Sequence, residues 1–132
     1  MPNVTFALKN TWATFNRNVA YVAGPYRAKT QEEVQHNVDN AREVVKWAWK
    51  KGFVVISPHL NHAGIVTGML DEEAVIMPAC LKLVGRCDLI IMVPGWQESQ
   101  GSREEHGEAV KLKLGRLYPS WEVIRRQLQE GG

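Results

Sequence analysis

The stretch "PGWQESQGSREEHGEA" (residues 94–109) follows the apolar run "DLIIMVPGW" and holds a group of closely spaced carboxylates. Ser102 and Glu105 have the S-x-x-E spacing of a capping box, in which the glutamate satisfies backbone donors at a helix start. In that interpretation Glu105 is purely structural and also favours the helix dipole.

Helical periodicity favours a second interpretation of the same glutamate. Glu105 shares a stripe with Ala109 and Leu112, which should face the rest of the fold, whereas Glu104 and Glu108 belong to a solvated stripe. Glu105 would then be partly desolvated at the start of a helix. Such a carboxylate suits a nucleophile or a general base. The pattern alone leaves the two interpretations open.

The surrounding elements alternate between apolar runs and helical patterns. Apolar runs at residues 18–24, 53–58 and 88–95 predict buried strands, and residues 116–118 predict a short fourth strand. Helical patterns occupy residues 30–52, opened by a capping box at Thr30, and residues 71–85, 102–114 and 119 onward. This alternation predicts an α/β fold: a single domain over residues 1–132, with a flavodoxin/Rossmann-like parallel sheet of four to five strands and helices on both faces. Residues 1–18 form an N-terminal arm that the pattern does not place.

Ligands of such sheets bind at the carboxyl ends of the strands. Three loops reach that edge, at residues 24–29, 58–64 and 94–102, and they bring their polar residues toward Glu105. Arg27 is a candidate phosphate ligand there, and the backbone N–H groups at Gly101 and Ser102 offer an anion site at a helix start.

Composition limits the classes of function. The 132 residues are 45% hydrophobic and 23% charged, with a net charge of +2, which suits an ordinary globular domain. The dispersed charge argues against nucleic-acid binding, and no apolar run reaches the length of a membrane span. Cys80 and Cys87 form neither a CxxC motif nor a disulfide framework. We expect a cytoplasmic protein that requires no cofactor and holds no metal.

The motifs together are similar to the nucleoside 2-deoxyribosyltransferase-like family. The similarity runs from "YVAGPYRA" through "GFVVISPH" to "CDLIIMVPGWQESQGSREEHGEA", about residues 20–117. The family includes deoxyribosyltransferases and nucleoside 5′-monophosphate N-glycosidases. Its most specific motif, E-x-G-x-A, corresponds here to residues 105–109, and its nucleophilic glutamate corresponds to Glu105.

The resemblance also implies a set of substrate-binding residues. Its first-strand loop, which lines the sugar or phosphate pocket in the family, corresponds to Gly24, Pro25, Tyr26 and Arg27. Ser99 stands where transferases of the family carry an aspartate and where the monophosphate glycosidases carry serine. Cys80 stands near the position of the family's aspartate beside the departing base. The other residues expected at the pocket are His59, Trp96, Gly101 and Ser102, with Trp96 stacking on a base.

The resemblance implies an enzyme that cleaves or transfers the N-glycosidic bond of a (deoxy)nucleoside or its 5′-monophosphate through a glycosyl-enzyme intermediate. One alternative is a non-catalytic nucleotide-binding module of the same fold. A weaker alternative is a metal hydrolase using His59, His62 and His106, although zinc wants three protein ligands and a second shell of contacts. Five tryptophans in so short a chain also predict a homo-oligomer, as the resemblance does.

Overall fold

The computed structural model describes residues 18–58, 60 and 75–130. Its strands are β1 (Val19–Ala23), β2 (Val54–Ile56), β3 (Leu89–Met92) and β4 (Gly115–Leu117). Its helices are α1 (Gln31–Lys50), α3 (Met77–Val84), α4 (Gln100–Lys111) and α5 (Trp121–Gln129), with a short 3₁₀ turn, η3 (Trp96–Glu98). The predictions for the N-terminal arm and for the loop with His59 and His62 concern residues outside these ranges.

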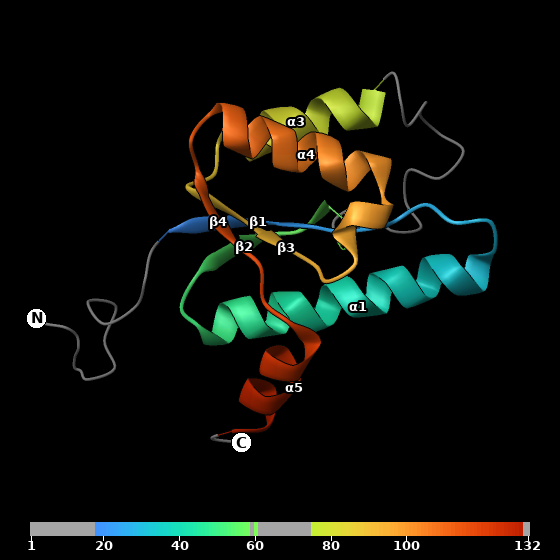
Figure 1. Ribbon diagram of the computed structural model, residues 1–132, viewed down its shortest axis with the longest axis vertical. Helices are drawn as coiled ribbons and strands as arrows, with labels where there is room; N and C mark the ends of the chain where they lie inside the picture. Colours follow the sequence, from blue (N-terminus) through green and yellow to red (C-terminus); the bar gives the residue numbers. More distant parts are fainter. Residues whose placement is uncertain (1–17, 59, 61–74, 131–132) are drawn as a thin grey trace, which may run out of the picture.

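The four strands form one parallel sheet in the order β2-β1-β3-β4. This is the order of flavodoxin-like sheets, with the switch point between β1 and β3. Helices α3 and α4 cover one face, and α1 and α5 cover the other (Figure 1). The fold class predicted from the alternation of elements is confirmed.

Side chains of the two central strands alternate between two hydrophobic layers, as the pleat requires. Ala20 and Val22 of β1 pack with β3 residues such as Ile91 against α1 and α5. Tyr21 and Ala23 point to the opposite face and pack against α3 and α4. β1 therefore places the Tyr21 side chain in the hydrophobic layer between the sheet and helices α3 and α4.

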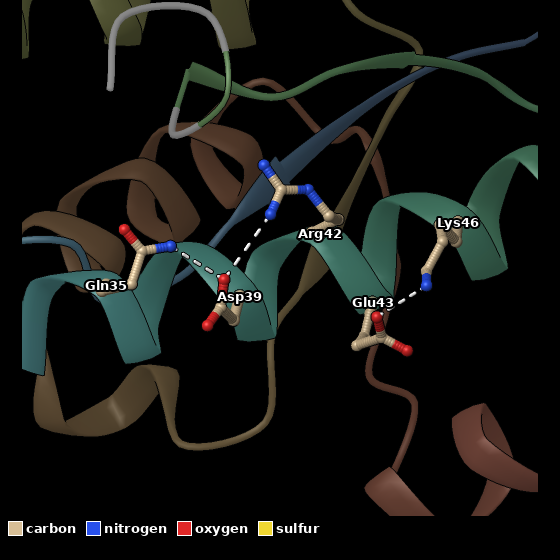
Figure 2. Close-up of polar contacts among 5 residues, drawn as sticks. All are labelled: Gln35, Asp39, Arg42, Glu43 and Lys46. Atoms are coloured by element: carbon tan, nitrogen blue, oxygen red, sulfur yellow. Dashed lines mark hydrogen bonds and ion pairs between the residues drawn. The ribbon is translucent and has the colours of Figure 1, made fainter. Parts of the chain in front are cut away.

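The predicted start of α1 is confirmed. Thr30 Oγ1 accepts from the Glu33 backbone N–H, and the Glu33 side chain accepts from the Thr30 N–H, as in a capping box. The solvent-facing side of α1 carries polar contacts between side chains three or four residues apart (Figure 2). These join Gln35 to Asp39, Arg42 to Asp39 at 3.5 Å and Lys46 to Glu43 at 2.8 Å. Exposed pairs of this kind contribute about 0–1 kcal/mol each, so this is a solvated face.

Two local predictions are wrong. The run at residues 53–58 was expected to be buried, but β2 lies at the edge of the sheet and Val54 is 37% exposed. Leu112 was expected to face the sheet, but α4 ends at Lys111 and Leu112 is 41% exposed as its C-cap residue. Periodicity gives a strand or a helix, but it does not say whether a neighbour covers it.

Pro78 lies in the first turn of α3, where its missing N–H costs nothing. Within the helix predicted for residues 71–85, the structure describes α3 at Met77–Val84. Within the described residues, no helix is both long enough and apolar enough to cross a membrane.

Candidate functional site

A cavity of about 240 Å³ opens at the carboxyl ends of the central strands. Its walls come from the loop after β1, from Pro58 two residues after β2, and from the first parts of α3 and α4. The lining residues are Gly24, Tyr26, Arg27, Pro58, Ile76, Met77, Cys80, Ser99, Gln100, Gly101, Ser102 and Glu105. The volume lies a little below the usual range for small-molecule sites, about 300–1,000 Å³.

Gly24 allows the β1 loop to pass close to β3. A Cβ built on Gly24 would lie 2.6 Å from Cβ of Val93 and 2.7 Å from its Cγ2. No ordinary side chain fits at that distance, so the position needs glycine for a close approach rather than for an unusual φ. The contact fixes where Tyr26 and Arg27 enter the cavity wall.

The start of α4 differs from the capping box that the sequence suggested. Ser99 is the N-cap residue, and its Oγ accepts from the Ser102 backbone N–H at 3.2 Å. Helix α4 therefore begins at Gln100, not at Ser102, and Glu105 lies one turn further in. The structural interpretation of Glu105 as the capping-box partner of Ser102 is wrong, because the cap belongs to Ser99.

Glu105 instead lies on the inner face of α4, where it is 7% exposed. The Tyr21 hydroxyl donates a hydrogen bond to Oε2 of Glu105. Glu104 is exposed and Glu108 is half-buried, so the helix turns these two neighbours away from the core. The choice of Glu105 from periodicity agrees with its position in the cavity wall.

Burial dominates the electrostatics of this carboxyl group. Desolvation raises the pKa of Glu105 to about 7, the Tyr21 hydrogen bond pulls it partly back, and Glu104 adds a small upward contribution. The pKa of Tyr21 is raised far above its usual value, chiefly by burial and then by the Glu105 charge. Tyr21 is therefore a neutral donor, and Glu105 is poised between its charged and neutral forms near neutral pH.

Cys80 lies on the opposite wall, on α3, and is also buried. Burial raises the pKa of its thiol, as does the charge of Glu105, while hydrogen bonding with Tyr21 lowers it. Ile76 and Met77 extend this wall. The α3 side of the cavity is therefore apolar apart from one neutral thiol.

The α4 side is polar. Ser102 is 1% exposed, and its Oγ has no hydrogen-bond partner among the described residues. Buried hydroxyls are normally paired, so this one is a candidate ligand contact. The first turn of α4 adds backbone N–H groups, and Arg27 adds a positive charge from the facing loop. Together these groups suit an anion or several hydroxyls.

The cavity brings together most of the predicted site residues. Pro25 and Trp96 are not in its lining, and His59 lies outside the described residues. Trp96 instead packs on His106, with ring centroids 4.4 Å apart, and His106 Nε2 lies 2.8 Å from the Tyr118 hydroxyl. Within the described ranges, no three His, Cys, Asp or Glu side chains are grouped closely enough to hold a metal ion.

Sequence reasoning missed Tyr21 as a functional residue. The usable signal was a tyrosine in the middle of the run "VAYVA", since a buried tyrosine hydroxyl generally needs a partner. Its partner could not be inferred, because it depends on α4 packing over β1. Met77 and Gln100 were missed for the same reason.

The fold is a flavodoxin-like α/β domain with a cavity at the carboxyl edge of its sheet. The chain belongs to the family described as a domain of unknown function, DUF4406, whose model matches residues 18–118. A search of the curated proteins found no match.

Proposed function

We propose that this protein breaks the N-glycosidic bond of a nucleoside or nucleoside 5′-monophosphate, with Glu105 as the nucleophile. The observation that carries the proposal is the Glu105 carboxyl group, buried in the cavity wall and held by the Tyr21 hydroxyl. The resemblance to nucleoside 2-deoxyribosyltransferase-like proteins gives the same residue the same role.

The reaction follows from the chemistry of the bond. As the C1′–N bond breaks, its electron pair leaves with the base, and positive charge develops on C1′ and the ring oxygen. The ionised Glu105 stabilises that charge and then forms an ester bond to C1′. Water releases the sugar and regenerates the carboxylate, or the nitrogen of a second base takes its place and yields a new nucleoside.

The two walls of the cavity favour different parts of such a substrate. Ile76, Met77 and Cys80 offer a mainly apolar surface to a flat base. Arg27, Ser102 and the first turn of α4 offer charge and donors to the sugar hydroxyls or a phosphate. We favour a 5′-monophosphate over the free nucleoside on this account.

Substrate and reaction are tested together with a panel of ribo- and deoxyribonucleosides and their 5′-monophosphates. Each is incubated with and without an acceptor base, and released or exchanged base is measured by chromatography. We expect base release, faster for monophosphates. Exchange into the acceptor indicates a transferase, and release alone indicates a hydrolase. Activity abolished by a chelator and restored by zinc contradicts the glutamate mechanism and favours a metal hydrolase.

A non-catalytic nucleotide-binding module is the second candidate. It is favoured by Cys80, a thiol that burial keeps neutral, where the resemblance leads us to expect an acid that protonates the departing base. Calorimetric binding of a monophosphate by wild-type protein, without release of base over many hours, would support the module and contradict the enzyme.

We also propose that the protein self-associates, which stays a prediction from the sequence. Several large apolar side chains are exposed on the described surface, namely Trp49, Val54, Val75, Val110, Leu112 and Tyr118. Sedimentation at micromolar concentration tests this, with a dimer or larger species expected. A monomer would contradict it.

A further inference from the structure

The first turns of α3 and α4 meet at the cavity. Met77, the first residue of α3, and Gly101, in the first turn of α4, both line it. A Cβ built on Gly101 would lie only 2.9 Å from Cε of Met77. The Met77 methyl group therefore occupies the space that a side chain at position 101 would need. It lies at the junction of the apolar wall and the polar wall.

Met77 is the adjustable part of the apolar wall. Ile76 is β-branched and therefore stiff at χ1, and the Cys80 side chain is short and buried in the α3–α4 layer. Methionine is unbranched, with three rotatable side-chain bonds and a polarisable sulfur atom. Met77 is also only half-buried, so protein atoms do not enclose its side chain on all sides. The reach of this side chain decides how much room remains between the two walls.

The cavity is small for the ligand that the proposed function requires. Its volume of about 240 Å³ must hold a base, a sugar and the 5′ group of that sugar, and small-molecule sites usually have about 300–1,000 Å³. Arg27, Ser102 and the first turn of α4 suit the sugar and its 5′ group. The base is left with the space along Ile76, Met77 and Cys80. A single six-membered ring needs less of that space than the two fused rings of a purine.

We propose that Met77 determines which bases the cavity accepts: its thioether leaves room for a pyrimidine and excludes a purine. The inference rests on the proposed function, and it goes further by naming the class of base and the residue that selects it. Shortening the Met77 side chain should admit the larger base. A difference of one methylene in a hydrophobic pocket already changes discrimination about 10- to 200-fold, so the effect should be large enough to measure.

The experiment compares two nucleoside 5′-monophosphates that share a sugar, one with cytosine and one with adenine. Calorimetry gives both affinities, and chromatography gives the release of base. We expect wild type to bind the cytosine nucleotide about 10-fold or more tightly than the adenine nucleotide. In Met77→Ala the ratio should fall close to one, through tighter binding of the adenine nucleotide. Met77→Val replaces Met77→Ala if that variant does not fold, with a change in the same direction.

Leu83→Ala is the matched control. It removes a side chain of similar size from the same helix, and Leu83 packs in the hydrophobic layer without lining the cavity. The ratio of the two affinities should stay at its wild-type value. A ratio that changes equally in Leu83→Ala and Met77→Ala overturns the inference, because the effect would then come from general loosening of α3.

Gly101→Ala tests the same contact from the other wall. Its new methyl group must displace the Met77 methyl, so it should alter the ratio of the two affinities in wild type but not in Met77→Ala. An equal alteration in both backgrounds, equal affinities of wild type for the two nucleotides, or an unchanged ratio in Met77→Ala overturns the inference. Binding with the expected ratios but without release of base would contradict the proposed function alone. A protein that binds neither nucleotide contradicts both.

Discussion

The Tyr21 hydroxyl on β1 donates a hydrogen bond to Oε2 of Glu105 on α4, across a sequence separation of 84 residues. This contact joins one of the two central strands of the sheet to the helix that forms the polar wall of the cavity. It holds a buried carboxylate in one orientation and stabilises its charge, while burial opposes that charge. The folded protein therefore keeps an ionisable carboxyl group buried, at a cost in stability when that group is charged.

That cost should appear in the pH dependence of stability. The folded-state pKa of Glu105, about 7, lies above its ordinary value of 4.5, so the group's contribution is fully present below about pH 4.5 and is lost as the pH rises through 7. Glu105→Gln has no such loss. Relative to wild type, the variant should gain roughly 3 kcal/mol between pH 4.5 and pH 8.

Denaturant unfolding at both pH values measures this difference. The exposed neighbour offers a matched control, since Glu104→Gln should follow wild type across the same range. A constant difference between Glu105→Gln and wild type at the two pH values would mean that the carboxyl group is not desolvated in solution.

Arg27 should discriminate between phosphorylated and free ligands. Replacing it with Met removes a charge-assisted contact worth about 1.5–3 kcal/mol, so binding of a monophosphate should weaken roughly 10- to 100-fold. Binding of the free nucleoside should change little. Titration calorimetry with both ligands measures the two effects.

Arg42→Met is the control for loss of an arginine. Arg42 lies on α1, paired with Asp39 (Figure 2), and is not among the residues that line the cavity. Its loss should leave both affinities unchanged. Equal weakening of both ligands by Arg27→Met would remove the basis for preferring a monophosphate.

Gly24→Ala tests the close approach of the β1 loop to β3. The new methyl group would lie 2.6 Å from Val93 Cβ, so the loop or the strand must move, at a cost of about 1–3 kcal/mol. Gly107→Ala, within α4 and with no atom within 4 Å of its new methyl, should stabilise the protein by about 0.5–1 kcal/mol.

If this packing is right, thermal unfolding should show that Gly24→Ala is less stable than wild type and that Gly107→Ala is more stable. Unchanged stability in Gly24→Ala would show that the loop is not held against Val93. Because the same loop carries Arg27, weaker ligand binding should accompany the loss of stability.

Much of the fold could be predicted because it depends on local pattern. Apolar runs and helical stripes gave four strands, their parallel arrangement and the capping box at Thr30. The exposure of Val54 could not be predicted, because among the described strands β2 pairs with β1 alone, at the end of the order β2-β1-β3-β4. Ser99, rather than Ser102, as the N-cap of α4 depends on where the 3₁₀ turn ends.

The site was predicted in part for a similar reason. Glu105 could be chosen because an acidic residue on an otherwise buried stripe is visible in the sequence. Tyr21 could not be joined to it, since the two residues lie on different elements and only tertiary packing brings β1 and α4 together. Trp96 was predicted to stack on a base, but its ring packs on His106 and does not line the cavity.

The central claim is that Glu105 is the reacting carboxylate, and a pair of isosteric substitutions tests it most directly. Glu105→Gln keeps the shape of the side chain and removes its nucleophilic charge, whereas Glu104→Gln makes the same change on the exposed side of α4. The measurement is the initial rate of base release from the best substrate of the panel. We predict loss of about three orders of magnitude or more in Glu105→Gln, with ligand affinity retained, and a nearly wild-type rate in Glu104→Gln. A Glu105→Gln variant that releases base as fast as wild type would contradict the account.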